Sequence, residues 1–499
     1  MNKRRITLLA FATIFTMIFI SCTGREMSEG SILELRYGFT TEPKTLDPLS
    51  MDNTADGRSI LFNVFEGLVK PDTDGTFLPC IAESWEIEQG GLIYVFRLRD
   101  GVRFHDGSVV NAQDVKFSLD AVIASGTAPF NQIREIIIQS SNEIRVVLES
   151  PDPDYLPYMT IGIVKANNMD RERNVIGTGP FYIESYSPQR ELVLKKFEDY
   201  WQPNPGGLDK VTIVFFANYE TLMIAMRAGT IDGANLTGSL IAQLNRNNFD
   251  IFDSYSAAVQ LLALNNAAPH LSNILVRKAL NYGIDIQGII DAAFFGSGTP
   301  SGSPVIPGLS AYYEPHLDYP YDPDYARALL GEAGYNENNR LSLEIAVPSN
   351  YVMHVDTAQV IADQLERIGV NTTIRLVDWT TWLDDIYRAR NYQATIISLD
   401  SSYISARNFL NRYHSGSNSN FINFNNNDFD IVYDSLLTET NARVRNGLYR
   451  EAQRIITSNA ASVFIQDIFF YKVFIKGVYE GVRNYPLYLI DFSSIRGID

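Results

Sequence analysis

Cysteine is almost absent from this sequence. Its 499 residues include only two cysteines, Cys22 and Cys80, which are too few for a disulfide framework or a zinc site of four thiolates. Histidine is also scarce, and its positions lack the spacing of metal ligands: His105, His270, His316, His354 and His414. We therefore expect neither a metal site nor a cofactor. Cys80 has no histidine or lysine close by in sequence and is interpreted as a small buried hydrophobic residue.

Lysine and arginine are outnumbered by acidic residues. Forty-one Lys and Arg residues stand against 58 Asp and Glu residues, which gives a net charge of -17, and the only basic run is residues 3–5. Such an acidic chain repels polyanions, so nucleic-acid binding is disfavoured. The sequence also lacks the phosphate-binding loop, the nucleophile motif G-x-S-x-G and the zinc motif H-E-x-x-H. These absences predict a protein that is not an enzyme.

An apolar run long enough to span a membrane is missing too. Ile6–Ile20 has 15 residues and follows the basic run, whereas a spanning helix needs about 20. This arrangement is typical of a secretory signal peptide, which we place at residues 1–21. The Phe-Ile-Ser-Cys sequence ending at Cys22 resembles the lipobox of bacterial lipoproteins. We expect an acylated Cys22, a linker over residues 22–31 and a mature protein held outside the cytoplasmic membrane; ordinary secretion with a coincidental cysteine is the alternative.

The residues that are present indicate a large folded protein. Hydrophobic residues make up 45% of the chain, and at roughly 150 residues per domain the length predicts two or three domains. Alternating apolar residues predict strands over 33–39, 92–99 and 211–215. Asp100-Gly101 is typical of a hairpin turn after the second of these strands. A helix over 219–228 is predicted to end at Gly229.

Strands and helices alternate in the second half of the chain. The predicted order is strand 341–347, helix 356–368, strand 373–377, helix 380–390 and strand 394–399. This alternation is typical of a parallel sheet covered by helices, which indicates the α/β class.

Two groups of side chains suggest sites. The acidic pairs Asp322/Asp324 and Asp384/Asp385 are compatible with a hydrolase, but they equally fit ordinary helix surfaces, where carboxylates near a helix start are stabilised. Trp379, after a predicted strand end, lies where parallel-sheet proteins bind ligands. Core packing is an equal alternative for this tryptophan.

Three longer stretches carry a resemblance to a known family: Ala82–Trp85, Tyr94–Gly107 and Ala112–Ser118. Shorter matches run along the rest of the chain: Glu42–Pro48, Phe65–Leu68, Gly177–Phe181, Tyr200–Trp201, Gly229–Asp232, Val276–Asp285 and Ala328–Gly334. With these motifs the sequence resembles the family 5 extracellular solute-binding proteins, which serve ABC importers for peptides and nickel, among others.

The resemblance implies an α/β, two-lobed periplasmic-binding-protein-like fold with mixed sheets and an additional small α+β domain. Lobe I would combine residues 32–64, 176–265 and 477–499. The small domain would be residues 65–175, and lobe III residues 266–476. The two lobes would close on a ligand.

The resemblance also implies ligand contacts. In oligopeptide-binding members the stretch after the Leu-Asp-Pro motif approaches the peptide, and here that stretch contains Asp52, Asn53 and Thr54. Trp379 matches a tryptophan that lines the pocket in those members.

One departure affects the expected cargo. Peptide-binding members carry Gly-Trp and, three residues after the Trp, an Asp that pairs with the peptide's ammonium group. Laid without gaps, these positions fall on Ser398, Leu399 and Ser402, while Asp400 lies two residues early. Either a local bulge brings Asp400 into that role, or the site binds something other than a free amino terminus.

The resemblance implies a monomeric, lipid-anchored receptor that delivers a peptide-like solute to the permease subunits of an ABC importer. A non-peptide solute, such as a nickel complex or an oligosaccharide, is the first alternative. A secreted hydrolase and an adhesin that has kept only the scaffold are the others.

Overall fold

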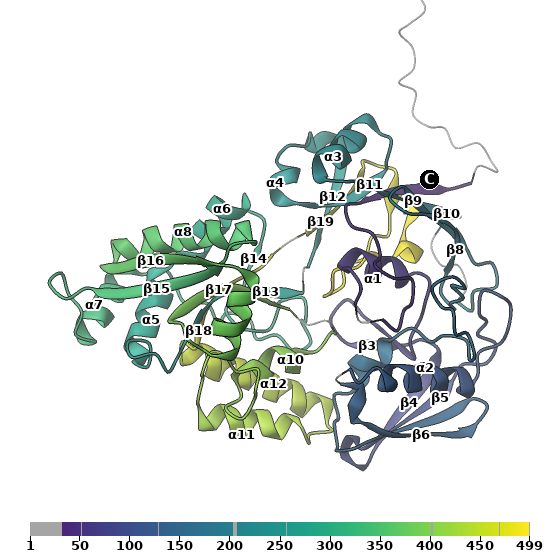
Figure 1. The fold of residues 1–499 in the computed structure, drawn as a ribbon, viewed down its shortest axis with the longest axis horizontal. Coiled ribbons are helices and arrows are strands. Elements are labelled where there is room, and N and C mark those ends of the chain that lie inside the picture. The colour runs from purple at the N-terminus through teal and green to yellow at the C-terminus, as the bar shows by residue number, and fades with distance from the viewer. Residues whose placement is uncertain are drawn as a thin grey trace, which may run out of the picture.

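A computed structural model describes residues 32–50, 52–127, 129–202, 207–255, 257–400, 403–468 and 470–498. The predicted signal peptide, Cys22 and Ser402 lie outside the described residues. Figure 1 shows three separate groups of strands, with the largest helical region on the left and two further groups on the right. Mixed sheets combined with helices confirm the predicted α/β class.

The first unit is built on a seven-stranded sheet with the order β12-β19-β11-β1-β10-β9-β8. The strands are β1 (Glu34–Phe39), β8 (Phe181–Ser187), β9 (Glu191–Lys196), β10 (Lys210–Phe215), β11 (Gly233–Thr237), β12 (Phe249–Ser254) and β19 (Phe470–Ile475). Strand β1 runs parallel to β10 and β11, and the other pairs are antiparallel. The alternating residues Leu35, Tyr37 and Phe39 are buried, as the period-2 pattern predicts.

Short elements complete the first unit: α1 (Ala55–Leu61), α3 (Tyr219–Ala228), α4 (Gly238–Ile241), β20 (Tyr479–Glu480) and β21 (Arg496–Gly497). Helix α3 begins at the cap Asn218 and ends at Gly229, whose φ of 66° satisfies the left-handed C-cap. The predicted helix over 219–228 is therefore confirmed with its end signal.

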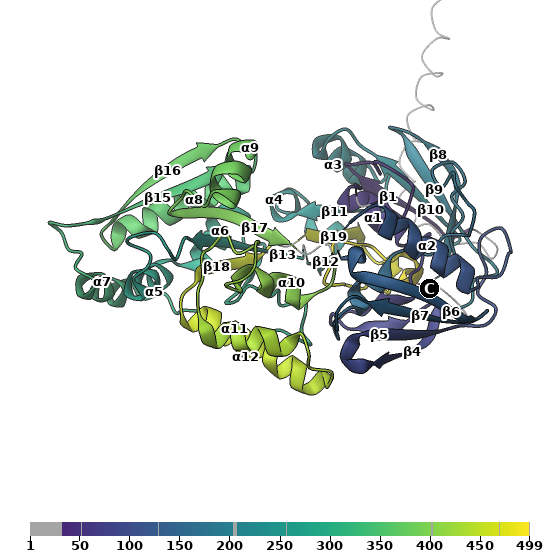
Figure 2. The same ribbon diagram turned by 60° about the horizontal axis from the view of Figure 1, so that its bottom comes forward.

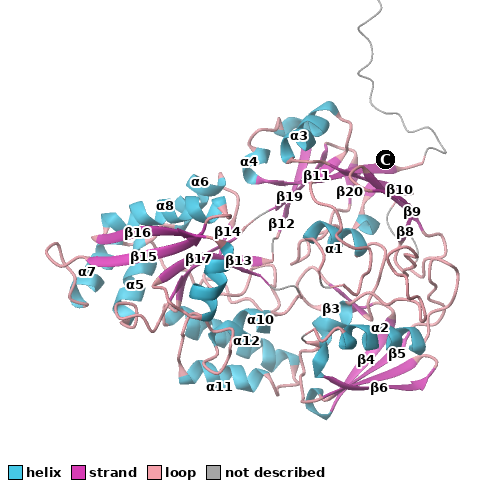
Figure 3. Cartoon of the chain, in the orientation of Figure 1, coloured by secondary structure: helices cyan, strands magenta, loops and turns pink. Residues whose placement is uncertain are grey.

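The second unit contains a six-stranded sheet with the order β14-β18-β13-β17-β15-β16. Its strands are β13 (Ala258–Leu264), β14 (Thr299–Pro300), β15 (Leu341–Pro348), β16 (Val370–Val377), β17 (Ala394–Asp400) and β18 (Ser462–Asp467). Strand β15 is parallel to both β16 and β17, which confirms the predicted parallel core, while β13 pairs antiparallel with its neighbours. Figure 3 shows the helices that cover this sheet.

These helices are α5 (Ile274–Gly283), α6 (Ile286–Phe294), α7 (Pro323–Glu332), α8 (Val352–Arg367), α9 (Trp379–Thr381), α10 (Ala406–Leu410), α11 (Asn427–Leu436) and α12 (Ala442–Ser458), with a π-helical segment over Trp382–Arg388. Helix α8 joins β15 to β16, and its Ala358, Ile361 and Leu365 are buried in one cluster with the strand residues Leu343 and Ile345. Figure 2 shows α11 and α12 below the sheet.

The third unit is the small α+β region. Strands β4 (Ala82–Glu88), β5 (Ile93–Leu98), β6 (Ile133–Ser140) and β7 (Glu143–Leu148) form an antiparallel sheet beside α2 (Ala112–Ala124), and β2 (Val69–Pro71) pairs with β3 (Phe77–Pro79). Asn111 and Asp114 form a reciprocal capping box at the start of α2. The hairpin predicted at Asp100-Gly101 is wrong, because β5 pairs with β4 and β7 instead.

The chain passes between the two large sheets twice. It leaves the seven-stranded sheet after β12 and enters the six-stranded sheet at β13, and it returns between β18 and β19. The sequence-based division placed β13 in lobe I and β19 in lobe III. Backbone pairing puts them the other way round. We therefore propose that lobe I is the first unit, lobe III the second unit and the small domain the third unit, and that the chain passes from one lobe to the other between Ser254 and Ala257 and between Asp467 and Phe470.

A half-buried histidine ties the small domain to lobe I. The side chain of His105 contacts Gly179 O through Nε2 at 3.0 Å, and Nδ1 accepts from the Gly177 amide at 3.2 Å. Burial lowers the pKa of His105 to about 4, so the ring is neutral. A Cβ on Gly177 would lie 1.9 Å from Val64 O, which explains why glycine stands here in the Gly-Thr-Gly-Pro motif. These motif residues hold the scaffold together.

Candidate ligand-binding cleft

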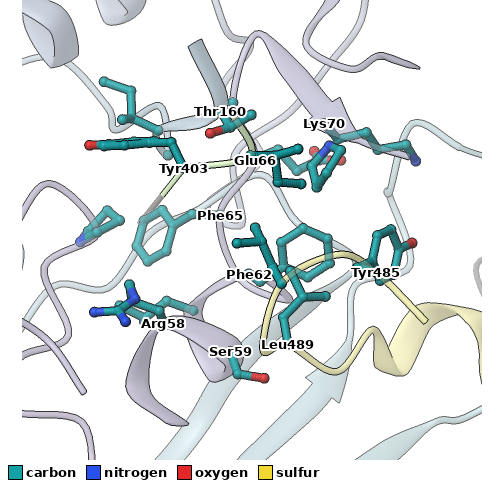
Figure 4. A pocket seen from close by; sticks show the side chains of 18 of the residues that line it. Arg58, Ser59, Phe62, Phe65, Glu66, Lys70, Thr160, Tyr403, Tyr485 and Leu489 are labelled. Carbon is teal, nitrogen blue, oxygen red and sulfur yellow. The ribbon is translucent and has the colours of Figure 1, made fainter. Parts of the chain in front are cut away.

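A cavity of about 510 Å³ lies where lobe I, the small domain and lobe III meet. Lobe I contributes residues of α1 and its flanks, among them Asn53, Arg58 and Phe62, and Phe65 follows at the start of the small domain. The small domain contributes Glu66, Lys70 and Thr160, and the C-terminal segment Tyr485, Tyr488, Leu489 and Asp491. Lobe III contributes Ala257, Asp400, Tyr403 and Ile404. Figure 4 shows Arg58, Phe65 and Tyr403 towards one side of the view and Tyr485 towards the other.

The three residues predicted after the Leu-Asp-Pro motif have different positions. Asn53 lines the cavity, but its amide is occupied by the backbone: Nδ2 donates to Thr45 O at 2.9 Å, and Oδ1 accepts from the Lys44 amide. Thr54 caps α1 by accepting from the Gly57 amide at 2.8 Å. Asp52 is exposed and pairs with Lys44 at 2.6 Å. Asp52 and Thr54 lie outside the cavity lining.

Trp379 lies outside the lining as well. It begins α9 directly after β16, is 38% exposed and stacks on Trp382 with ring centroids 5.1 Å apart and planes 1° from parallel. Trp382 is buried, and its Nε1–H donates to Thr395 Oγ1 at 3.0 Å. Trp382 is therefore a core residue, whereas Trp379 is partly exposed to solvent at the edge of the sheet.

Asp400, at the end of β17, does line the cavity. Its backbone carbonyl accepts from Arg412 Nη2 at 2.8 Å, which fixes the strand end. No hydrogen-bond donor for its carboxylate is found among the described residues, and the side chain is exposed. The structure thus brings Asp400 and Asn53 to one cavity, from lobe III and lobe I.

The acidic pairs are part of helix surfaces. Asp322 caps α7 through the Tyr325 amide, and Asp324 pairs with Arg327 one turn later. Asp384 pairs with Arg388. None of these carboxylates lines the cavity, so they offer no cleft with two opposed acids.

One buried carboxylate of the cavity wall is bound by scaffold residues. Glu66 accepts from Tyr200 Oη at 2.7 Å, Trp201 Nε1 at 3.0 Å and Cys80 Sγ at 3.3 Å. Burial raises the pKa of Glu66, and these donors oppose that rise. Burial, followed by the charge of Glu66, raises the pKa of the Cys80 thiol, so the thiol stays protonated. Cys80 is buried, as the sequence predicts.

The C-terminal segment closes the cavity from lobe I. Tyr488 Oη donates to Asp56 Oδ1 at 2.7 Å and accepts from Asn235 Nδ2 at 3.0 Å. Tyr485 Oη donates to Asp491 Oδ2 at 2.8 Å. These bonds hold two phenol rings against the cavity although they lie more than 400 residues after α1 in the chain.

Sequence reasoning missed most of the lining. Arg58, Phe62 and Phe65 follow one another at helical spacing around α1, and that period was the available signal. Tyr403, Tyr485 and Tyr488 carry no local signal, because only the tertiary fold brings them to the same place.

Metal-binding clusters and membrane-spanning helices are both missing from the described residues. No group of three or more His, Cys, Asp or Glu side chains within them is arranged to hold a metal ion. Within the same residues, every helix is too short or too polar to cross a membrane.

Comparisons with known proteins agree with this architecture. The chain is 28% identical over 428 residues to heme-binding protein A of Haemophilus influenzae, covering 77% of each chain. It is 27% identical over 495 residues to the probable deoxycholate-binding periplasmic protein YgiS of Escherichia coli K12, covering 91% of this chain and 90% of the relative.

Among solved structures, the unliganded open form of the murein tripeptide-binding protein MppA superposes with a TM-score of 0.83 at 21% identity, covering 93% of this chain and 97% of that one. HbpA2 of Haemophilus parasuis gives 0.82 at 22% identity, covering 93% and 99%. These likenesses confirm the two-lobed fold. Residues 76–421 match the family model described as bacterial extracellular solute-binding proteins, family 5 Middle. The chain therefore belongs to the family 5 extracellular solute-binding proteins.

Proposed function

We propose that this protein is the receptor of an ABC importer that captures a peptide-like solute between two closing lobes and delivers it to the membrane permease. The observation that carries the proposal is the position of the cavity. Its wall combines residues of lobe I with Ala257, Asp400 and Tyr403 of lobe III, next to the two chain crossings. A solute bound there contacts both lobes at once.

Contact with both lobes explains how binding drives closure. Two connecting segments allow one lobe to rotate against the other, which is the hinge arrangement of two-lobed binding proteins. A ligand stabilises the closed state only by the contacts that it makes there and not in the open state. The proposed cycle breaks no bond in the solute, so the protein acts as a receptor and not as an enzyme.

Asp400 is the proposed partner for the ammonium group of a peptide. Its exposed carboxylate in the cavity wall offers a charge-assisted bond, which is stronger than the neutral bond of a serine hydroxyl. Ser402 stays a proposed contact at the position where peptide-binding members carry the aspartate. Asn53 is proposed to shape the cleft, with Asp52 and Thr54 supporting the loop before α1. Trp379, which lies outside the lining, stays a proposed contact at the sheet edge of lobe III.

The aromatic wall also supports a non-peptide solute as second candidate. Phe62, Phe65, Tyr403, Tyr485 and Tyr488 surround the cavity, and such faces bind flat or apolar rings as well as side chains. The relatives' names fit this range, since they include binding proteins for heme, deoxycholate and glutathione. An oligosaccharide or a nickel complex remains within this alternative.

The proposed location is extracytoplasmic. A signal peptide over residues 1–21 and an acylated Cys22 would tether a monomer to the membrane, close to the permease. Each buried CH₂ group contributes about 0.8 kcal/mol, so several acyl chains bind the protein to the membrane far more strongly than one chain does. Metabolic labelling with a fatty-acid analogue, compared between wild type and Cys22→Ala, tests this anchor.

Thermal unfolding with candidate solutes tests the receptor function. Alanine peptides from dipeptide to pentapeptide, oligosaccharides and nickel–histidine are added separately to the purified protein. A ligand at 100 times its Kd stabilises the folded state by about 2.7 kcal/mol, so a true cargo raises the melting temperature. Mass spectrometry must recover the cargo unchanged. Hydrolysis of a bound peptide would reject the receptor proposal in favour of an enzyme.

A further inference from the structure

The cavity wall contains more carboxylates than cations. Its acidic residues are Asp47, Glu66, Asp400 and Asp491, and its Lys and Arg residues are Arg58 and Lys70. A charged side chain that already forms an ion pair or hydrogen bonds within the protein is less available to a solute. The partners of each side chain therefore show which charges a solute can use.

Three of the four carboxylates already have strong partners. Asp47 pairs with Arg171 at 2.8 Å. Glu66 accepts three donors, described above, and Asp491 accepts from Tyr485 and from the amide and hydroxyl of Ser493. Among the described residues, only the carboxylate of Asp400 in this wall has no hydrogen bond or ion pair, although the nearby Arg412 guanidinium interacts with its charge.

Both cations donate to neutral oxygens, but only Lys70 also interacts with a carboxylate of the wall, that of buried Glu66. Lys70 Nζ lies 3.3 Å from Gln202 Oε1 at the surface. Arg58 uses Nη1 to donate to Asn53 O at 2.7 Å, and no carboxylate of a described residue forms an ion pair with it. A guanidinium carries five N–H donors in a planar fork, so most of them stay available for another acceptor.

The position of Arg58 is fixed by its helix. Thr54 caps α1, and the neighbouring Ile60 and Leu61 are buried in the core of lobe I. The bond to Asn53 O then directs the side chain. Arg58 and Tyr403 of lobe III line the same cavity. The charge of Arg58 accordingly opposes the rise in the pKa of Tyr403, which is caused first of all by burial.

We propose that Arg58 is the residue of lobe I that binds a carboxylate of the solute. This inference rests on the proposed function and names the chemical class of the cargo: a carboxylate-bearing solute. Arg58 and Asp400 then present opposite charges to one cavity from different lobes. A solute with an anionic and a cationic end contacts both and draws the lobes together.

Calorimetry with alanine peptides and their C-terminal amides tests the assignment on the full mature chain. The amide removes the negative charge of the peptide and leaves the rest unchanged. A charge-assisted bond of about 1.5–3 kcal/mol corresponds to a roughly 10- to 100-fold change in affinity. We expect wild type to prefer the free peptides by this factor and Arg58→Gln to bind both forms alike.

Arg227→Gln is the matched control. Arg227 is an exposed residue on α3 that also donates to a backbone carbonyl, Gln243 O at 3.1 Å, but it does not line the cavity. It must keep the wild-type preference, and the melting temperature of ligand-free Arg58→Gln must match that of wild type.

The outcomes separate the two proposals. If wild type binds free peptides and amides equally, or if Arg58→Gln keeps the preference, Arg58 does not bind a carboxylate, although the receptor proposal stands. If wild type binds no peptide of either form, the peptide-like cargo is rejected together with this inference.

Discussion

Asp152 of the small domain and Arg407 of α10 form a buried ion pair between two units of the protein. Arg407 Nη1 lies 2.5 Å from Asp152 Oδ1, and their side chains are only 11% and 6% exposed. Beside them Tyr449 Oη donates to Asp154 Oδ2 at 2.6 Å, and Tyr158 packs edge-on against Tyr403 of the cavity wall. The small domain is thus joined to lobe III at the margin of the cleft.

Removing one partner of this pair should be strongly destabilising. Asp152→Asn removes the hydrogen-bonded counter-charge of the buried Arg407 guanidinium and leaves it only the charge of neighbouring Asp154, for which we expect a loss of up to about 3–5 kcal/mol in the free energy of unfolding. Urea denaturation of the ligand-free protein measures it. Arg496→Gln, which removes an exposed ion pair with Glu480, should cost at most about 1 kcal/mol. Equal losses in both variants would show that the Asp152–Arg407 pair does not stabilise the interface.

Two glycine substitutions should have opposite effects. Gly177→Ala places a Cβ 1.9 Å from Val64 O, so backbone must shift; we expect a loss of about 2 kcal/mol or more. Gly447→Ala lies inside α12 with nothing near the new Cβ, and alanine should stabilise this helix by about 0.5–1 kcal/mol. Chemical denaturation of both variants checks the signs. Destabilisation by Gly447→Ala would contradict the open space found there.

Acidic pH should destabilise the protein partly through His105. Its pKa falls from the ordinary histidine value of 6.5 to about 4 in the folded protein, because burial disfavours the charged ring. The unfolded chain therefore binds more protons than the folded one between these values. The contribution to stability is complete above pH 6.5 and is lost as the pH falls towards 4.

The variant His105→Gln should flatten this dependence, since an amide can donate and accept in place of the ring without titrating. Melting temperatures measured from about pH 7 down to about pH 4 test it. His316→Gln, at an exposed position, is the control and should follow the wild-type curve. If the melting temperature of His105→Gln falls with pH as steeply as that of wild type, other groups cause the loss of stability.

Asp400→Asn tests the proposed ammonium contact. The substitution keeps the shape of the side chain and removes its charge, so a peptide with a free amino terminus should bind roughly tenfold more weakly or worse. An N-acetylated peptide should bind wild type and variant equally. Calorimetry of both peptides measures the difference, with Asp384→Asn on an outer helix as control. Unchanged affinity for the free peptide would make Asp400 part of the scaffold only.

Local patterns in the sequence predicted many elements of the fold. Helix α3 with its Gly229 end and the alternation from β15 to β17 follow from side-chain period and cap chemistry over a few residues. The prediction of a hairpin at Asp100-Gly101 was wrong, because a turn motif does not specify which strand pairs with the strand before it. Strand β5 found its partner β7 some 50 residues later.

The cleft was less predictable than the scaffold around it. Asn53 and Asp400 were named from the family pattern, and both line the cavity. Trp379 and Asp52 were named in the same way but lie outside its lining. Arg58 and the tyrosines Tyr403 and Tyr485 were not named, because a motif that identifies a family consists mainly of turn and packing residues.

The sequence alone determined the class of the chain, its acidic surface charge and the local geometry of its helices and strands, because these depend on composition and on neighbours a few positions apart. The tertiary structure decided the sheet order, the two crossings between lobes, and the meeting of Asp152 with Arg407 across 255 positions of the chain. It also decided which charges in the cleft are left without protein partners. The physical reason is that long-range pairing is set by burial and hydrogen bonding over the whole molecule, which no short stretch of residues encodes.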